Sequence, residues 1–410
     1  MHILFYRNLI AAFAAIVAIV SMVMLPTPVR ATDLGGFYAP PLPLASYCLN
    51  DGDVIKDEPS NFVLPTQTPY SARRIMYCSR DTNGARMAVT GTVITPVLPW
   101  IGSGPRPIIG FAVGTQGMGD QCAPSYQVST ASPMEYEVTA IATLLTAGYG
   151  VTIPDYQAMG TPGVPSYLNR NALGHAVLDS IRAAQRLTSA FLPAAGPVAF
   201  WGYSEGGMAS GAAAELQTSY APDLQLKGAY VGAAPANLQL LAQYLDGKPA
   251  AGVLLYMLDS MNAAYPKAGF LDMLNAAGQQ VASQALNECW DQTLVQHALL
   301  QTSTLTNDGR PIPAHLAEQP LASPVNQQQL GLVPPTVPVF VVHSQFDDIV
   351  PYQAGHDMAV SWCNRGATVQ FTALTAPTHL AALLASIPLA LAYIQNRFAG
   401  LPAPYNCGNF

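Results

Sequence analysis

The sequence predicts an α/β fold with a mostly parallel, doubly wound sheet and a helical cap insertion. Short apolar stretches alternate with segments of helical spacing through most of the chain, which is typical of parallel strands whose connecting helices cover both faces of the sheet. The alternation stops at residues 237–334 and then resumes. At 410 residues, 50% of them hydrophobic, the chain is long enough for one domain with a large insertion, or for two domains.

The first half of the chain supplies most of the expected strands. The proline-rich residues 32–69 lack clear periodicity and predict an extended lead-in over the surface. Residues 86–95 alternate as a half-buried antiparallel strand does, and 107–113 form a short apolar run before glycine-rich sequence, as a buried strand does before a loop. Further strands are expected at 150–153, 198–201 and 224–231, and helices at 137–146, 171–188 and 206–216.

The second half contains the insertion and the end of the sheet. Residues 237–334 have helical stretches and Gln-rich loops without a convincing strand, which predicts a helical cap on the sheet. The elements expected after it are a strand at 337–342, a helix at 352–363, a strand at 367–371 and a helix after His379. The predicted core therefore comprises residues 32–236 and 335–410.

The N-terminus has the order of a targeting segment. Arg7 provides a positive charge, an apolar run spans residues 9–25, and small residues precede Thr32. This order predicts a signal peptide, residues 1–31, that is cleaved on export. An uncleaved membrane anchor is the alternative, because the apolar run is long for a signal peptide. We therefore expect a secreted, extracellular protein.

The charge of the chain excludes nucleic acid as an expected partner. Only 10% of the residues are charged, and the net charge is −7. Neutralising phosphates requires clustered Lys and Arg, and the sequence has no basic stripe.

The cysteines predict disulfides. An even number of cysteines in an exported chain indicates three bridges, and leaves their pairing open. The cysteines are Cys48, Cys78, Cys122, Cys289, Cys363 and Cys407. A metal site is not predicted, because the sequence has no Cys-x-x-Cys and no tight Cys/His cluster.

A nucleophile elbow is the strongest chemical signal in the sequence. Residues 202–206 are Gly-Tyr-Ser-Glu-Gly, the Gly-x-Ser-x-Gly pattern, and they lie between an expected strand and an expected helix. In an elbow the serine occupies a tight, strained turn, so nearby positions must lack side chains. Its Oγ lies at a helix N-terminus, where negative charge is favoured. The pattern predicts Ser204 as the nucleophile; an ordinary helix N-cap is the alternative.

The serine needs a base to take its proton and an acid to orient that base. In this fold the acid precedes the histidine along the chain. His379 lies in a loop between the last expected strand and helix, where the base belongs; a surface histidine is the alternative. Asp347 and Asp348 follow the preceding strand and point differently, so only one can meet the imidazole. We predict Asp347, with Asp348 as a cap or turn residue and His343 as a packed or turn residue.

The predicted oxyanion hole consists of two backbone N–H groups aimed at the developing negative charge. One belongs to Glu205, directly after the nucleophile. The other comes from the glycine-rich loop 114–119, at Thr115 or Gln116, where glycines permit close approach of the backbone to a substrate. A plain glycine-rich turn is the alternative.

Several blocks of the sequence resemble the secretory lipases of the fungal lipase A type, a family with many bacterial members. The blocks are Gly-Thr-Gln-Gly at 114–117, Asp-Gln-Cys-Ala-Pro-Ser at 120–125, Asp-Tyr at 155–156, Gly-Thr-Pro-Gly at 160–163, Leu-Asp-Ser-Ile-Arg-Ala-Ala at 178–184, the elbow, Asp-Asp-Ile-Val-Pro-Tyr at 347–352 and Thr-His-Leu at 378–380. The resemblance covers nearly all of the chain after about Tyr47. The blocks at 120–125 and 347–352 are much more specific than the elbow.

The resemblance implies an α/β-hydrolase fold with a helical cap between the elbow and the acid. It also implies catalysis by Ser204, Asp347 and His379 without a cofactor. The disulfides that it implies are Cys122–Cys289, Cys363–Cys407 and, from the remaining two cysteines, Cys48–Cys78. The oxyanion loop departs from the family, because bacterial members often have His before its first glycine, where this chain has Val113, and because Gln116 is unusual.

Together these features predict a secreted carboxylic-ester hydrolase, a lipase or esterase, that forms an acyl-enzyme on Ser204. Apolar stretches of the cap, 251–258 and 261–265, either line an acyl tunnel or form the cap's own core. A tunnel favours lipid esters as substrates, with transient contact to a lipid interface. An exported serine peptidase shares the same triad, although the cap has few charges to bind peptide termini. A non-catalytic binding protein is a third hypothesis, and the complete triad argues against it.

Overall fold

Nine strands form one mostly parallel sheet in the computed structural model, which describes residues 34–130 and 136–410. The strands are β1 (Val54–Pro59), β2 (Tyr70–Arg80), β3 (Arg86–Pro96), β4 (Ile108–Ala112), β5 (Gly150–Pro154), β6 (Pro197–Tyr203), β7 (Gln225–Gly232), β8 (Val339–Ser344) and β9 (Val369–Leu374). Their order in the sheet is β1-β2-β3-β5-β4-β6-β7-β8-β9. The pairs β1–β2, β2–β3 and β3–β5 are antiparallel. The remaining pairs, β5–β4, β4–β6, β6–β7, β7–β8 and β8–β9, are parallel. The predicted signal peptide, 1–31, lies outside the described residues.

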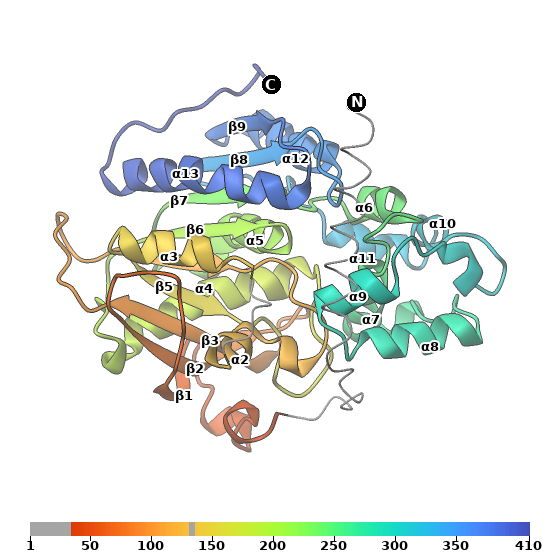
Figure 1. Ribbon diagram of the computed structural model, residues 1–410, viewed down its shortest axis with the longest axis horizontal. Coiled ribbons are helices and arrows are strands. Elements are labelled where there is room, and N and C mark those ends of the chain that lie inside the picture. The colour runs from red at the N-terminus through yellow and green to blue at the C-terminus, as the bar shows by residue number, and fades with distance from the viewer. Residues whose placement is uncertain (1–33, 131–135) are drawn as a thin grey trace, which may run out of the picture. The chain divides into compact units, whose positions relative to one another are not determined.

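Helices cover both faces of the sheet (Figure 1). Those on one face are α4 (Arg170–Arg186), α5 (Glu205–Tyr220) and α12 (Tyr352–Asn364), and those on the other are α3 (Val138–Thr146) and α13 (His379–Phe398). On the first face, the Trp362 indole N–H donates a 2.8 Å hydrogen bond to the Glu215 carboxylate and joins α12 to α5. The predicted doubly wound, mostly parallel α/β class is confirmed.

The central strands are buried along their whole length, because helices cover them on both sides. Every residue of β4, β5 and β8 is buried, which explains why these strands are continuous apolar runs in the sequence. Helix α13 is long and apolar enough to cross a membrane by length and composition alone. It packs against β7 and β8, however, with Leu383, Ile387 and Ile394 buried, as a core helix of a globular protein does.

The extended lead-in predicted at 32–69 is partly wrong, because this segment contributes β1 to the sheet. Strand β1 has the polar sequence Val-Ile-Lys-Asp-Glu-Pro and only half-buried side chains, so it lacks the apolar signal of a strand. Its partner β2 stabilises it from across the pair: Arg73 pairs with Asp57, and Arg74 with Glu58 at 3.0 Å. Long-range pairing therefore forms this edge strand where local sequence does not predict it.

Between β7 and β8 the described chain adds no strand to the sheet. The helices of this segment are α6 (Leu238–Leu245), α7 (Val253–Ala264), α8 (Ala276–Ala285), α9 (Trp290–Gln296), α10 (Ile312–Leu316) and α11 (Ala322–Gln327). Figure 1 shows them gathered at one end of the sheet. They belong to the same compact unit as the sheet, Asp33–Phe410. We call residues 237–334 the cap.

Three disulfides join segments that are distant in the sequence, and they are the pairs that the resemblance implies. They are Cys48–Cys78, Cys122–Cys289 and Cys363–Cys407. The first joins the lead-in to β2, and the third joins α12 to the C-terminal segment. The second joins the loop after β4, just before α2 (Pro124–Ser129), to the cap.

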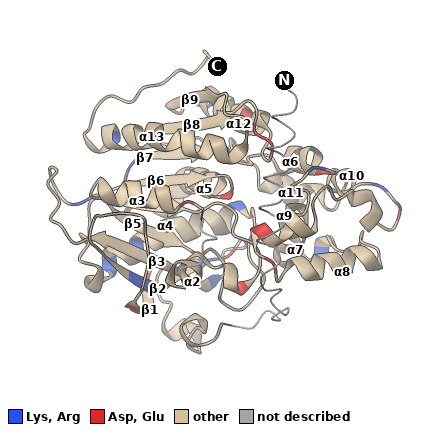
Figure 2. Cartoon of the chain, viewed as in Figure 1, with Lys and Arg blue, Asp and Glu red and all other residues tan. Residues whose placement is uncertain are grey.

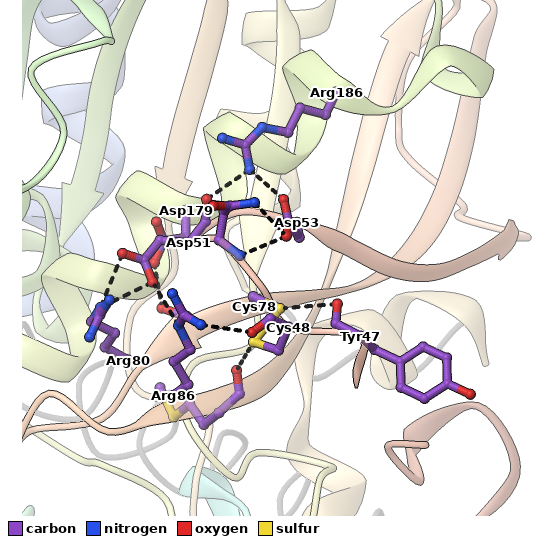
Figure 3. The surroundings of a disulfide bond; sticks show 12 residues. Tyr47, Cys48, Asp51, Asp53, Cys78, Arg80, Arg86, Asp179 and Arg186 are labelled. Atoms are coloured by element: carbon purple, nitrogen blue, oxygen red, sulfur yellow. Dashed lines mark hydrogen bonds and ion pairs between the residues drawn. A yellow bond between two sulfur atoms is a disulfide. The ribbon is translucent and has the colours of Figure 1, made fainter. Parts of the chain in front are cut away.

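Ion pairs surround the Cys48–Cys78 disulfide (Figure 3). The Arg80 Nε atom lies 3.0 Å from Asp51 Oδ1, and Arg186 of α4 lies 3.0 Å from Asp53. These pairs fasten the turn before β1 to β2 and α4. Elsewhere in the described chain, Lys and Arg are scattered rather than gathered in a stripe (Figure 2).

Candidate active site

Ser204 lies on the turn between β6 and α5. Its backbone has φ 62° and ψ −125°, a left-handed conformation that residues with side chains rarely adopt and that marks a strained turn. A Cβ atom on Gly202 would lie 1.9 Å from the Gly206 carbonyl oxygen, and one on Gly206 would lie 2.0 Å from that of Ala112. Only glycine fits at both positions, so the sequence folds into an elbow with Ser204 at the N-terminus of α5.

His379 and Asp347 meet although they lie on different segments: Asp347 is on the loop after β8, whereas His379, predicted in a loop, begins a helix. His379 is the first residue of α13, and its Nδ1 atom lies 2.7 Å from Asp347 Oδ2. The other oxygen, Asp347 Oδ1, accepts the backbone N–H groups of Ile349 at 2.9 Å and Val350 at 2.8 Å. Asp348 Oδ1 accepts the backbone N–H of His379 at 2.8 Å. The two neighbouring carboxylates thus contact different parts of His379: Asp347 contacts the imidazole, and Asp348 binds the backbone N–H at the start of α13.

The Asp347 carboxylate stays ionised at neutral pH although it is buried. Burial by itself raises the pKa of Asp347, but the attraction and hydrogen bond of His379, together with the hydrogen bond from the Val350 N–H, outweigh that effect. The pKa of Asp347 therefore lies below its usual value. A carboxylate in this state can fix the tautomer of an imidazole and stabilise its cation.

Thr115 and Gln116, which sequence reasoning leaves as alternatives, point in different directions. Thr115 lines a pocket beside Ser204. Gln116 is fully buried, and its side chain accepts a hydrogen bond from Gln127 at 3.1 Å and donates one to the Gly114 carbonyl at 3.2 Å. Thr115 therefore faces the pocket beside Ser204, and the Gln116 side chain holds the loop in place from the side away from the pocket.

The loop that contains Thr115 is fixed at both ends. Glu137 accepts the Gly114 N–H at 2.5 Å from the core side. The Trp290 N–H donates to the Gln116 carbonyl at 3.0 Å from the cap side, close to the disulfide that joins this loop to the cap. Backbone N–H groups on this loop are thus held in place before a substrate arrives, as an oxyanion hole requires.

A mostly apolar pocket opens at Ser204 and His379. Its lining residues are Thr115, Tyr136, Tyr167, Ser204, Glu205, Pro235, Leu241, Leu245, Ala250, Val253, Trp290, Leu294, Ile349, Val350, His379 and Leu380. Core and cap both contribute to it, so a substrate that reaches the serine lies between them. Within residues 34–130 and 136–410, no group of three His, Cys, Asp or Glu side chains is arranged to hold a metal ion.

The two apolar stretches of the cap contribute unequally to the pocket. From 251–258, Val253 lines the pocket, and the remaining residues are buried in the cap and core. No residue of 261–265, all of them in the described chain, is part of the lining. The rest of the wall on the cap side comes from α6, Ala250 and α9. Residues 251–258 therefore pack mostly as core, whereas in 261–265 only Met261 is buried.

Comparison with known proteins decides the family. The chain matches the model of the secretory lipase family over residues 124–406. It is 30% identical to Lipase 10 of Candida albicans over 393 residues, which cover 90% of this chain and 82% of that protein. Its fold is similar to the X-ray structure of Candida antarctica lipase A in its closed state, with a TM-score of 0.81, 26% identity and coverage of 93% of this chain and 90% of the other. The chain belongs to the secretory lipase family.

Family membership confirms the α/β-hydrolase fold and makes this secretory lipase a carboxylic ester hydrolase. One relative differs in its name. A Mycobacterium tuberculosis protein that is 27% identical over 345 residues, 82% of this chain and 75% of that protein, is called a probable inactive lipase. In the present lipase the elbow, the Asp347–His379 pair and the pocket occur together.

Sequence reasoning missed a second histidine beside the acid of this lipase. His343, expected only to pack or turn, is fully buried at the end of β8. Its Nε2 atom lies 3.0 Å from the Val350 carbonyl oxygen and 3.5 Å from Asp347 Oδ2. Burial lowers the pKa of His343 to about 4, so this side chain is neutral at pH 7. It contacts the loop of Asp347 without placing a second positive charge beside the carboxylate.

Two tyrosines also hold the backbone at His379 and Asp347. The Tyr203 hydroxyl donates to the His379 carbonyl at 2.8 Å, and its ring lies 4.8 Å from the imidazole, centroid to centroid. The Tyr244 hydroxyl, from α6 of the cap, donates to the Asp347 carbonyl at 2.7 Å. The only sequence signal for Tyr203 is its place inside the elbow, and Tyr244 has none, because its contact depends on how the cap folds back.

Proposed function

We propose that this secretory lipase is a secreted serine hydrolase that cleaves acyl esters through an acyl-enzyme on Ser204. One observation carries the proposal: the 2.7 Å Asp347–His379 contact and the strained serine at the elbow open on the same apolar pocket. An imidazole oriented by a carboxylate is the arrangement that activates a serine hydroxyl.

The reaction has two steps. In the first, Ser204 Oγ attacks the ester carbonyl carbon while His379 takes its proton, and the C–O bond to the alcohol breaks as His379 returns that proton to the leaving oxygen. In the second, His379 takes a proton from water, the hydroxide attacks the acyl carbon, and the carboxylic acid leaves as Ser204 regains its proton. Asp347 orients His379 and stabilises its cation in both steps. The Glu205 and Thr115 N–H groups are the proposed donors to the oxyanion.

Lipid-like acyl esters are the substrates that the pocket favours. Its lining is mostly apolar and includes Leu380, which is 44% exposed. Two more large apolar side chains are exposed on the segments that carry His379 and Asp347: Leu384 of α13 is 57% exposed and Phe346 is 60% exposed. We propose that these three side chains form an apolar rim of the pocket. Leu380 and Phe346 directly follow and precede His379 and Asp347 in the sequence. This apolar rim would contact a lipid surface when the pocket takes up an acyl chain.

Labelling with a fluorophosphonate tests the proposal directly. The probe is expected to modify Ser204 in the mature protein, as peptide mapping by mass spectrometry would show, because only an activated serine reacts rapidly with it. The same preparation is then assayed on p-nitrophenyl esters and on peptide p-nitroanilides, and the two hydrolysis rates are compared. Faster turnover of peptides would favour the peptidase, and absence of label would favour a non-catalytic binding protein.

Enlarging Ala250 is expected to shorten the acyl chains that the enzyme accepts. Ala250 lines the pocket from the cap and is 2% exposed, so tryptophan in its place fills space that a long chain would occupy. For Ala250→Trp, kcat/KM on C12–C16 p-nitrophenyl esters should fall about tenfold more than on C2–C4 esters. The control is Ala277→Trp, on the exposed side of α8, which should leave the profile unchanged. An unchanged profile for Ala250→Trp would place the acyl chain elsewhere.

Export with removal of residues 1–31 is part of the proposal. N-terminal sequencing of protein recovered from the culture medium should begin at Thr32. Retention of the apolar run in a membrane-bound product would support the anchor instead.

A further inference from the structure

Glu205, directly after the nucleophile, buries a carboxyl group beside the reacting region. It is the first residue of α5 and is 2% exposed. Its Oε2 atom has no hydrogen-bond partner among the described residues, and no Lys, Arg or His of the described chain pairs with it. A buried carboxylate without a cation is costly, so this side chain needs an explanation beyond the backbone N–H that the elbow uses.

The surroundings of the Glu205 carboxyl connect it to the oxyanion loop. Glu205 and Thr115 line the same pocket, and the Thr115 side chain and the Leu168 backbone lie close enough to the carboxyl group to lower its pKa. Thr115 Oγ1 in turn lies 3.2 Å from the Tyr167 hydroxyl. The titratable groups that face Glu205 are Tyr167, from the loop before α4, and Tyr256 of α7. Burial raises the pKa of both tyrosines, so they stay neutral and offer hydroxyl groups but no charge.

We propose that Glu205 is a positioning residue of the oxyanion hole, that it acts through the Thr115 hydroxyl, and that it does so as a neutral carboxylic acid. This inference rests on the proposed function. A threonine hydroxyl fixed between a carboxyl group and the Tyr167 hydroxyl has one orientation, and the adjoining Thr115 backbone N–H is fixed with it. The oxyanion hole therefore has its second donor in place before substrate binds.

Neutrality matters because Glu205 adjoins the place where negative charge develops. An ionised carboxylate there would repel the oxyanion across a region that water does not screen. Burial raises the pKa of Glu205 to about 8, against the effects of Thr115 and Leu168, which lower it. The carboxyl group is therefore mostly neutral at pH 7 and loses its proton in mildly alkaline solution, where the oxyanion hole should weaken.

The test is a pH profile of hydrolysis from pH 6 to 10. Wild type, Glu205→Gln, Glu205→Leu, Thr115→Val and the Glu205→Leu/Thr115→Val double variant are compared on p-nitrophenyl butyrate. The kcat of wild type should fall about tenfold from its plateau by pH 9, since a group with a pKa of about 8 is then about one-tenth neutral. Glu205→Gln cannot ionise, so its kcat should stay level from its own plateau to pH 9, whatever its rate at pH 7.

The leucine variant tests the connection through Thr115. Glu205→Leu should lower kcat at pH 7 about tenfold with little change in KM, because the lost interaction serves the transition state. In the Thr115→Val background the same change should have little further effect, since both act through one hydroxyl. Asp259→Asn is the matched control: Asp259 is another buried acid, and burial raises its pKa to about 7, but it does not line the pocket. This variant should keep the alkaline decline.

Two outcomes overturn the inference. A Glu205→Gln profile with the wild-type decline would show that another group titrates. If the fold losses in kcat of Glu205→Leu and Thr115→Val multiply in the double variant, the two residues act independently, and Glu205 does not act through Thr115. If Glu205→Leu does not fold, the glutamine profile decides alone. Fluorophosphonate labelling separates this failure from failure of the proposed function: an unlabelled wild-type Ser204 refutes the mechanism, whereas a labelled Ser204 with an unaltered Glu205→Gln profile refutes only the role of Glu205.

Discussion

Replacing Ser204 with alanine is expected to lower kcat for p-nitrophenyl esters by roughly 10³-fold or more. The variant lacks the Oγ atom that forms the acyl-enzyme, so water must attack the bound ester without a covalent intermediate. The oxyanion donors and the pocket remain, and they account for the residual rate. Initial rates of the purified mature protein on esters of graded chain length, at saturating and subsaturating concentrations, measure the loss in kcat and KM separately.

Ser210→Ala is the matched control for this experiment. Ser210 is also on α5 and fully buried, but its hydroxyl donates to the Tyr230 carbonyl at 2.8 Å, away from the pocket. Its loss should cost about 1 kcal/mol in the free energy of unfolding and leave kcat nearly unchanged. Activity that survives in Ser204→Ala would remove the serine from the mechanism, and a wild type without activity on any ester would turn attention to peptide substrates or to binding without catalysis.

The fold could be predicted where strands are buried and helices follow them. The apolar run 198–201 becomes β6 (Pro197–Tyr203), and the helical pattern at 352–363 becomes α12 (Tyr352–Asn364). Such elements carry their signal in their own residues, because a strand covered on both faces must be apolar throughout. Strand β1 could not be predicted in the same way, since its stability comes from Arg73 and Arg74 of a neighbouring strand.

The residues of the site likewise fall into those that the sequence indicates and those that it does not. The elbow has a local signal, since its pattern lies within five consecutive residues and a Cβ on Gly202 would meet the Gly206 carbonyl. Chain order then indicates where the acid and base belong. The supporting contacts depend on how the chain turns and packs. His343 is only four residues before Asp347, but the two side chains meet because β8 ends between them and the chain turns there. Tyr244 is distant in the sequence and reaches Asp347 only after the cap folds back onto the core. The sequence pattern indicates neither contact, so both become visible only in the folded chain.

Asp347 and Asp348 offer a sharp test, because two adjacent residues of the same type hold different atoms of His379. Asp347→Asn is expected to lower kcat by about 10³- to 10⁴-fold. An amide in place of the carboxylate gives the His379 Nδ1 atom a neutral partner that stabilises neither the required tautomer nor the imidazolium. Steady-state kinetics on p-nitrophenyl butyrate at pH 7 measure the effect.

Asp348→Asn is the control, and its expected loss in kcat is less than about tenfold. Asp348 Oδ1 accepts the backbone N–H of His379, and the oxygen of an asparagine side chain can accept the same bond. Both variants remove one negative charge from the same loop, so a general effect of charge or of loop stability would lower both rates together. A larger loss in Asp348→Asn would reverse the roles of the two aspartates. Near-normal rates in both would mean that His379 works without a carboxylate, and the 2.7 Å contact would then be structural only.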